Sequence, residues 1–311
     1  MQRLTSPAIV MGHQSLSTVA PDYVQLFKHN VSLASSSRSD KQRKDALSYL
    51  TSQLSEVEPV NPVGTGTLVT KLLPLISDSS TPVRAQLLKL LRTLPQDEVK
   101  PVVEHAIMYI RAGMTHLSAD ISNDSLTAMD WLLDAADDEL VTCPGGWVKT
   151  LSTFCAIMGW TVSTAAKGWS SGSGSRSTMR AKDAQSHAKQ IASLTKFLEA
   201  GFKSESIPND VAAQYWDNLY RIPRSTNAFE YLNLSGARRD EDGEMYADRQ
   251  ARKQIFQRRF YEAMIKGIEQ SKKEGGVTGR AVTKLDQVLQ GAMKDYDASA
   301  SIDTGDLLDL W

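Results

Sequence analysis

The sequence predicts an all-α protein built as a HEAT- or armadillo-like solenoid of paired helices. Strand signals are scarce, because alternating Val, Ile and Tyr segments bounded by turns are nearly absent. Apolar residues at helical spacing occur along most of the chain instead. Three such segments recur at a nearly constant interval, with Leu47, Leu87 and Leu126 separated by 40 and 39 residues. Helix pairs that recur at about 40–47 residues are typical of HEAT and armadillo repeats.

Each of the three repeating helices has a signal for where it begins. The first follows Ser39 or Asp40, either of which can serve as the N-cap. The second has Thr81 as its cap and Pro82 at the first helical position, where the missing N–H costs nothing. The third follows Ser122. The alternative is an irregular bundle whose helices have similar lengths. Companion helices are expected before the three, over residues 22–34, 66–77 and 98–115.

A fourth unit begins near Pro144, and Trp147, Leu151 and Phe154 share one face of its helix. Residues 163–180 are rich in Ser and Gly and predict a flexible loop. Further helices are expected over residues 181–201, 209–220, 243–271 and 278–295. The predicted organisation is an N-terminal extended segment (1–21), a helical-repeat domain (22–162), the loop (163–180), a helical region that continues the solenoid (181–296) and a tail with an apolar docking segment (297–311).

Composition excludes several classes of protein. The 311 residues include 35 basic and 36 acidic side chains, for a net charge of −1, which argues against wholesale nucleic-acid wrapping. No apolar run approaches the roughly 18 residues that span a bilayer, so no membrane partner is expected. Cys143 and Cys155 make no disulfide framework, and a reducing compartment is the default.

Motifs for catalysis or metal binding are not found. The five histidines are dispersed, and the segment around Gly64 and Gly66 lacks the Gly-Lys-Ser/Thr that closes a phosphate loop. We interpret His105 and His116 as buried, hydrogen-bonded side chains. The sequence therefore predicts no enzymatic activity, no cofactor and no metal site.

Two stretches have unusual composition: RAGMTHLSADI (111–121) and CPGGWVKTL (143–151). One interpretation is structural: Gly113 permits a kink, while Gly145 and Gly146 let the chain turn closely under Trp147. The other interpretation is an exposed ridge of the solenoid that a partner protein grips.

These stretches, with DWLL at 130–133, resemble the family of fungal pre-rRNA-processing protein Ipi-one and animal testis-expressed protein ten. The segments FKHNVSLASSSRSDKQRKDALSYLT and SDSSTPVRAQLLKLLRTLP also resemble that family, so the similarity covers residues 9–160. The resemblance implies a non-enzymatic scaffold subunit of the nuclear Rix-one complex. The implied partners are the Rix-one protein, the WD-repeat subunit Ipi-three and large ribosomal subunit precursors. The implied process is removal of the second internal transcribed spacer and remodelling with the AAA ATPase midasin.

The candidate partner-binding residues come from these stretches and from the tail. The tail ends in four large apolar side chains within five residues, which predicts either a linear docking motif for a partner or a segment that folds back on the solenoid. We favour docking. The candidates are Arg111, His116, Asp120, Trp131, Gly145, Gly146, Lys149, Leu307, Leu308, Leu310 and Trp311.

A second functional class is direct binding of rRNA. Residues 249–259 contain five basic residues and no acidic one. On a helix, Phe256 would lie on the same face as Arg249, Arg252 and Lys253. The alternative is a solvated helix face balanced by the acidic segment 240–244. A third class is a HEAT adaptor of nuclear transport or chromatin. The RNA-binding candidates are Arg249, Arg252, Lys253, Arg258 and Arg259.

Overall fold

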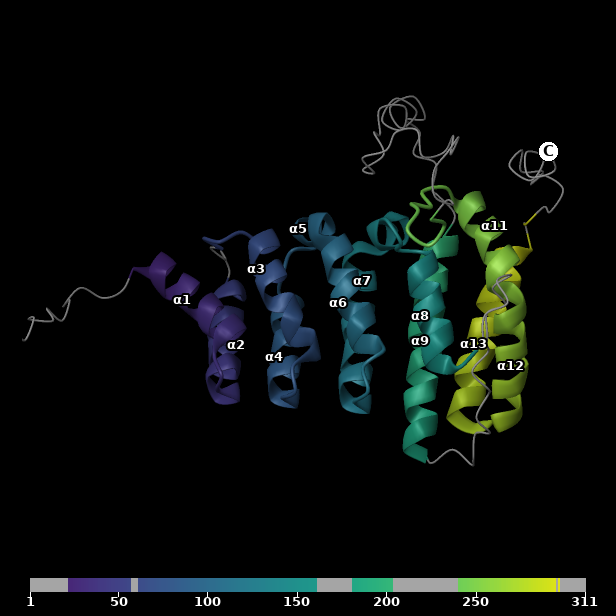
Figure 1. The fold of residues 1–311 in the computed structure, drawn as a ribbon, viewed down its shortest axis with the longest axis horizontal. Helices are drawn as coiled ribbons and strands as arrows, with labels where there is room; N and C mark the ends of the chain where they lie inside the picture. Colours follow the sequence, from purple (N-terminus) through teal and green to yellow (C-terminus); the bar gives the residue numbers. More distant parts are fainter. Residues whose placement is uncertain (1–21, 57–60, 161–180, 204–239, 295, 297–311) are drawn as a thin grey trace, which may run out of the picture.

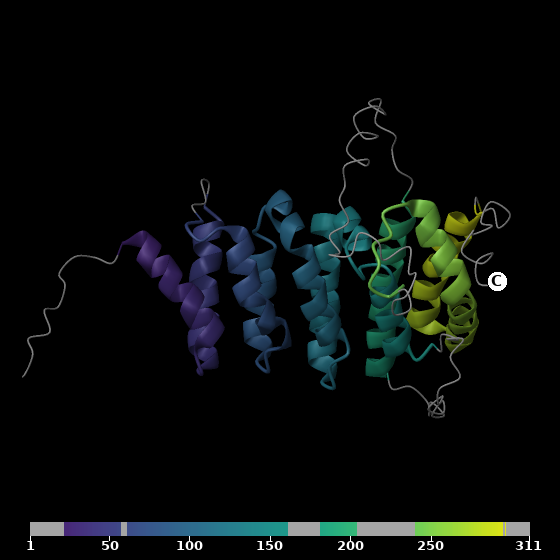
Figure 2. The ribbon, with the colours of Figure 1, turned by 45° about the horizontal axis from the view of Figure 1, so that its top comes forward.

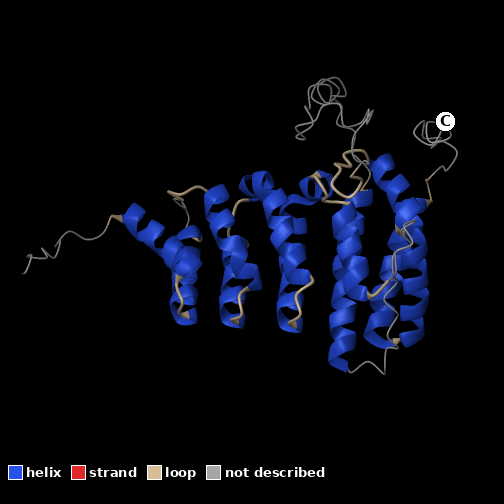
Figure 3. Ribbon diagram, in the orientation of Figure 1, coloured by secondary structure: helices blue, strands red, loops and turns tan. Residues whose placement is uncertain are grey.

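The helices of this protein stand in pairs, side by side, and form an elongated stack (Figure 1). The computed structural model describes residues 22–56, 61–160, 181–203, 240–294 and 296. All regular elements within these ranges are helices (Figure 3), which confirms the all-α solenoid. The elements are α1 (Tyr23–Ser36), α2 (Asp40–Leu54), α3 (Thr65–Leu72), η1 (Leu73–Ser77), α4 (Thr81–Leu91), α5 (Gln96–Val99), η2 (Lys100–Val102), α6 (Val103–Met114), α7 (Ala119–Thr142), α8 (Val148–Met158), α9 (Ala181–Phe202), α11 (Arg249–Arg259), α12 (Tyr261–Glu274) and α13 (Gly276–Met293).

The stack has two layers. In layer A, α1, α3, α6 and α8 pack one after another. In layer B, α2, α4, α7, α9 and α13 do the same (Figure 2). Across the layers, α2 contacts α1, α4 contacts η1, α7 contacts α6 and α9 contacts α8. At the C-terminal end, α12 packs on α13, and α11 contacts both α9 and α12.

The core lies between the layers and contains the leucines that define the repeat. Leu47, Leu87 and Leu126 are each at most 1% exposed. Burying a leucine side chain contributes about 1.5–3 kcal/mol, so apolar burial of this kind stabilises every pair of helices. The core is continuous from α1 to α13 because each pair buries its apolar face against the next.

Prolines shorten two of the expected layer A helices. The segment 66–77 is divided into α3 and the 3-10 helix η1, which has Pro74 at its start. The segment 98–115 is divided into α5, η2 and α6, with Pro101 in η2. Proline removes a backbone N–H and clashes with the preceding turn, so a continuous α-helix cannot pass through these positions.

Two expected caps are displaced toward the N-terminus. α4 has Ser80 as its N-cap, and Thr81 is the first helical residue. α7 has Ser118 as its N-cap, four residues before Ser122. Ser122 lies inside α7, where its N–H donates to the Ser118 carbonyl, and its Oγ donates a hydrogen bond to the carbonyl of Met114 at 2.8 Å.

The C-terminal helices differ from expectation in one place. The expected helix 243–271 is two helices, because Asp248 caps α11 by accepting from the N–H of Ala251 and the chain bends at Phe260. The bend places the rings of Phe260 and Tyr261 each 6.4 Å from the ring of Phe256. The expectations for residues 1–21, 163–180, 209–220 and 297–311 lie outside the described residues.

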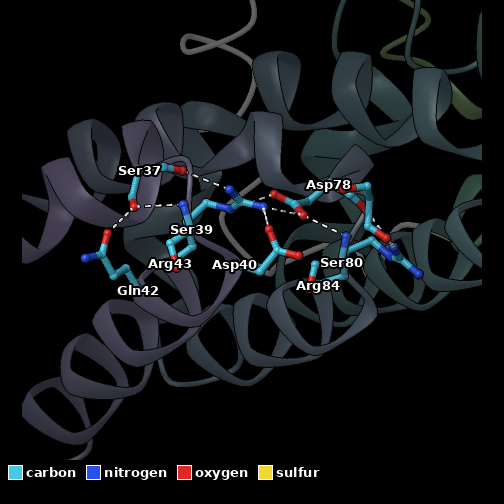
Figure 4. Close-up of polar contacts among 9 residues, drawn as sticks. Ser37, Ser39, Asp40, Gln42, Arg43, Asp78, Ser80 and Arg84 are labelled. Atoms are coloured by element: carbon cyan, nitrogen blue, oxygen red, sulfur yellow. Dashed lines mark hydrogen bonds and ion pairs between the residues drawn. The ribbon is translucent and has the colours of Figure 1, made fainter.

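Ion pairs and hydrogen bonds link successive repeats near the N-terminal ends of the layer B helices. Arg43 is the fourth residue of α2, and its Nε lies 3.0 Å from Asp78 Oδ2. Arg84 is the fourth residue of α4; its Nε lies 2.8 Å from Asp124 Oδ2 and its Nη1 donates to the Asp78 carbonyl at 2.7 Å. Asp78 therefore lies between the two arginines (Figure 4). The equivalent positions show that α2 and α4 belong to repeats of one kind.

Candidate partner interface

The turn between α7 and α8 brings four of the candidate residues together. Arg111 Nη1 donates to the carbonyl of Gly145 at 2.7 Å, and burial lowers the pKa of this guanidinium from its ordinary value. Gly145 has φ +64°, and a Cβ there would lie 2.9 Å from the Lys149 side chain. A Cβ on Gly146 would lie 2.1 Å from the carbonyl oxygen of Leu140. The two glycines therefore allow the chain to turn closely. Of the four candidate residues, only Lys149 is exposed.

Trp147 lies beneath this turn and is fully buried. Its ring stacks on Phe197 with centroids 5.2 Å apart and meets Phe202 edge-on at 5.4 Å. Its Nε1 donates to the carbonyl of Arg252 at 3.1 Å. Gly201 makes room for the indole, since a Cβ there would lie 2.0 Å from the ring. Trp147 thus joins α8, α9 and α11.

Gly113 has a packing role in place of the expected kink. It lies inside α6, where a Cβ would be 2.1 Å from Ser125 Oγ and 3.2 Å from Ile76. The absence of a side chain therefore allows α6 and α7 to approach each other closely.

His116 lies in the exposed turn from α6 to α7, and Asp120 is exposed in the first turn of α7. The Nδ1 atom of His116 accepts from the N–H of Ser118 at 3.0 Å. Leu117, between them, is completely exposed. The expectation that His105 and His116 are buried is wrong, because both lie on the outer side of α6 or just beyond its end.

α6 also exposes apolar side chains that the sequence analysis did not single out. Met108 is 52% exposed and Tyr109 is 36% exposed. The opposite side of the helix buries Ile107 and Ile110. The signal was present in the sequence, because VEHAIMYIRAGM is apolar on both sides, which is unusual for a helix with one solvated face.

Trp131 lies on a groove of about 310 Å³ in layer B, and only 7% of the residue is exposed. Asp130 also lines the groove; its Oδ2 is 3.4 Å from Lys196 Nζ, while its Oδ1 is buried without a hydrogen-bond partner. Trp131 is therefore a wall residue of this groove, separate from the Gly145 turn. The lining residues are Arg92, Leu94, Gln96, Thr127, Asp130, Trp131, Asp134, Ala135 and Lys196.

The expectation that α11 presents a basic surface is wrong for Arg252 and Lys253, because both side chains are buried. Arg252 Nε donates to the carbonyl of Gly201 and Arg249 Nε to that of Phe202, both at 2.8 Å. These carbonyls belong to the last turn of α9, where unpaired carbonyls concentrate negative charge. Arg249 and Arg252 therefore cap the C-terminal end of α9.

The other two candidates for RNA binding are engaged by the acidic segment before α11. Arg258 Nη2 lies 2.5 Å from Glu241 Oε1, and Arg259 Nη1 lies 2.6 Å from Asp242 Oδ1. The Arg259 guanidinium also lies over the ring of Phe260 at 5.6 Å. These ion pairs compete with any phosphate contact.

Residues Leu307, Leu308, Leu310 and Trp311 lie outside the described residues. Within the described part of the chain, no group of three or more His, Cys, Asp or Glu side chains is placed to hold a metal ion. None of the described helices has both the length and the apolar character needed to cross a bilayer.

Comparisons with known proteins place the chain in a family. A family model described as "Rix1 complex component involved in 60S ribosome maturation" matches residues 97–198. The pre-rRNA-processing protein IPI1 of Pyricularia oryzae is 50% identical over 94% of this chain and 88% of its own length. Its counterpart in Chaetomium thermophilum is 49% identical over 92% of this chain and 86% of its own length. The protein named ipi1 in Aspergillus fumigatus is 40% identical over 92% and 86%.

A chain in a solved structure described as a Rix1-Rea1 pre-60S particle matches 70% of this chain and 79% of its own length, with 19% identity and a TM-score of 0.47. The identities to the fungal proteins extend over nearly the whole of both sequences. The chain therefore belongs to the family of the pre-rRNA-processing protein IPI1.

Proposed function

We propose that this protein is a non-enzymatic scaffold subunit of the Rix1 complex that acts in maturation of the large ribosomal subunit. The observation that carries the proposal is 49–50% identity to two pre-rRNA-processing proteins over at least 86% of their length. The description of the family model, a Rix1 complex component in 60S maturation, agrees with this role.

The fold supports a scaffold. A stack of helix pairs exposes a long surface relative to its core, which suits binding of several proteins at once. His116 before α7, Asp120 in its first turn and Lys149 on α8 are exposed, where a partner can reach them. Arg111, Gly145 and Gly146 shape the backbone beneath that surface. Direct RNA binding through α11 has less support, because Arg252 and Lys253 are buried.

The proposed partners are the Rix-one protein (Rix1), the WD-repeat subunit Ipi-three and precursors of the large ribosomal subunit, with transient participation of midasin. The proposed location is the nucleus, in the nucleoplasm and nucleolus. The proposed process includes removal of the second internal transcribed spacer. Family membership is the basis for each of these assignments.

The test is affinity purification of the tagged chain from its native source. We expect Rix1, the WD-repeat subunit and large-subunit precursor RNA in the eluate, and accumulation of spacer-containing RNA after depletion of the protein. Recovery of the tagged chain without these components, with unchanged precursor RNA, would contradict the proposal.

A further inference from the structure

We infer that the first two repeats bind the phosphate backbone of RNA through layer B. The inference rests on the proposed function, because precursors of the large ribosomal subunit supply the RNA, and it names the surface that contacts them. The basis is an excess of unpaired positive charge on α2, on the turn before it and on α4. This surface, called the basic track below, consists of Arg38, Lys41, Lys44 and Lys89.

Charge is distributed unevenly along the stack. Between residues 22 and 94, the described part of the chain has nine basic and five acidic side chains. Residues 95–160 have three basic and ten acidic side chains. The N-terminal end of the stack therefore attracts a polyanion, and the repeat that follows repels one.

Most cations of the first two repeats are exposed and form no ion pair with a described residue. The two exceptions are Arg43, which pairs with Asp78, and Arg84, which pairs with Asp124. An unpaired cation binds a phosphate without first giving up a carboxylate, so its full charge is available to a polyanion. The seven unpaired cations are Lys28, Arg38, Lys41, Lys44, Lys71, Lys89 and Arg92.

The basic track extends across two neighbouring helices of layer B. α2 and α4 lie side by side in a register set by Gln86, whose Nε2 donates to Thr51 Oγ1 at 3.1 Å. Lys41 and Lys44 lie about one turn apart on the exposed side of α2, and Lys89 is exposed on α4. In this register Lys89 is about 20 Å farther along the helix axes than Lys41, at 1.5 Å per residue. An extended row of cations suits a backbone of regularly spaced phosphates better than it suits a single anion.

Few carboxylates oppose the charge of the track. Residues 38–45 contain four basic and two acidic side chains. One of the two, Asp40, is held by Arg43, whose Nη2 lies 2.7 Å from its Oδ1. The other, Asp45, is exposed beside the lysines of α2, and α4 contains no acidic residue. The net charge of the track therefore remains positive.

The acidic side of the stack begins at the groove beside Trp131. Arg92, at the C-terminal end of α4, lines this groove together with Asp130 and Asp134. Its charge is therefore opposed from α7, and we do not count it in the basic track.

The track has none of the apolar anchors that a protein partner or a membrane requires. The five exposed large hydrophobic residues in the described part of the chain all lie outside α1–α4. Protein interfaces are centred on apolar or aromatic anchors, and a membrane-bound helix inserts such residues into the bilayer. The exposed neighbours of the lysines on α2 include Gln42, Ser48 and Ser52, whose amide and hydroxyl groups can donate to phosphate oxygens. This hydrophilic, cationic surface fits a phosphate backbone.

The experiment measures binding of the purified full-length chain to a fluorescein-labelled RNA duplex of mixed sequence, by fluorescence anisotropy at several salt concentrations. We expect affinity that falls steeply with salt, because phosphate contacts release counterions. The variant Arg38→Glu/Lys41→Glu/Lys44→Glu should lower the affinity at least about tenfold and reduce the salt slope by about two to three, or roughly one per lost phosphate contact. Lys89→Glu should lower the affinity about two- to fivefold.

The matched control is Lys273→Glu/Arg280→Glu/Lys294→Glu. It makes the same change of net charge with exposed side chains at the C-terminal end of the stack, none of which has an ion pair with a described residue. Its affinity should stay within about twofold of the parent affinity, because charges beyond a Debye length of the track are screened. Both triple variants should keep the parent melting temperature, since exposed, unpaired side chains contribute little to stability.

Three results would overturn the inference: equal losses of affinity in the two triple variants, binding that does not depend on salt, or no binding by the parent chain. The same variants in the affinity-purified complex separate the inference from the proposed function. The variant at residues 38, 41 and 44 should recover the other Rix1 complex subunits in full, while its ultraviolet cross-linking to precursor RNA should fall at least about fivefold.

Loss of those subunits from this variant would show that the track binds protein, which would also overturn the inference. Their absence from the eluate of the parent chain would instead reject the scaffold function, and the anisotropy measurement would still decide whether the track binds RNA.

Discussion

At the junction of α8, α9 and α11, the indole of Trp147 packs against Gly201, which has no side chain. Trp147 fills the space that Gly201 leaves, since a Cβ on Gly201 would lie 2.0 Å from the indole. We therefore predict that Trp147→Ala and Gly201→Ala are each destabilising, and that their effects on the free energy of unfolding are strongly non-additive.

The magnitudes follow from the packing. Trp147 is fully buried among aromatic rings, and truncation of such a residue costs about 3–5 kcal/mol. Gly201→Ala overpacks a filled site and costs about 1–3 kcal/mol. In the Trp147→Ala background the clash is gone, and alanine is a better helix former than glycine by about 0.5–1 kcal/mol. Gly201→Ala should therefore be neutral or stabilising in the Trp147→Ala background.

The assay is urea unfolding of the four proteins of the cycle, followed by far-ultraviolet circular dichroism. The expected coupling energy is about 1.5–4 kcal/mol, the overpacking cost plus the recovered helix propensity. Trp147→Phe is a useful control, because it keeps an aromatic ring and loses the hydrogen bond to the Arg252 carbonyl.

Additivity within about 0.5 kcal/mol would refute the close contact between Trp147 and Gly201. A Trp147→Ala variant with unchanged stability and lost partner binding would instead favour the interpretation of CPGGWVKTL as an exposed ridge.

Three further predictions follow from the described packing. Arg84→Ala should cost about 1–3 kcal/mol of unfolding free energy, because it removes the hydrogen bonds of a buried guanidinium while Asp124, whose side chain is 32% exposed, stays partly solvated. Lys89→Ala, which removes an exposed lysine, should change the melting temperature little. Gly113→Ala should cost about 1–3 kcal/mol by denaturant unfolding, with part of the loss recovered by Ser125→Ala, since the new methyl group meets the serine hydroxyl. Burial raises the pKa of the Cys155 thiol to about 12, so iodoacetamide at pH 8 should label this residue only after unfolding; mass spectrometry of a labelled native sample decides the point.

Sequence reasoning succeeded where the cause is local. Leucines at helical spacing, separated by 40 and 39 residues, were sufficient to predict paired helices in a repeating stack. Pro74 and Pro101 were visible as well, and a stricter use of their geometry would have divided the layer A helices correctly. The caps were displaced because Ser and Thr occur at several neighbouring positions, so that Ser80 and Ser118 precede the expected residues Thr81 and Ser122.

The tertiary structure alone decided which side of a helix faces inward when both sides contain suitable residues. Arg252 and Lys253 are buried despite their charge, and the Arg252 guanidinium donates to a carbonyl at the end of α9. Their long aliphatic stems pack well in such a setting. The exposure of Met108 and Tyr109 is the converse case, because α6 is apolar on two sides and only one can face α7. Periodicity therefore determined that helices form and pair, while the neighbours of each helix determined which charges became structural and which apolar residues remained available to a partner.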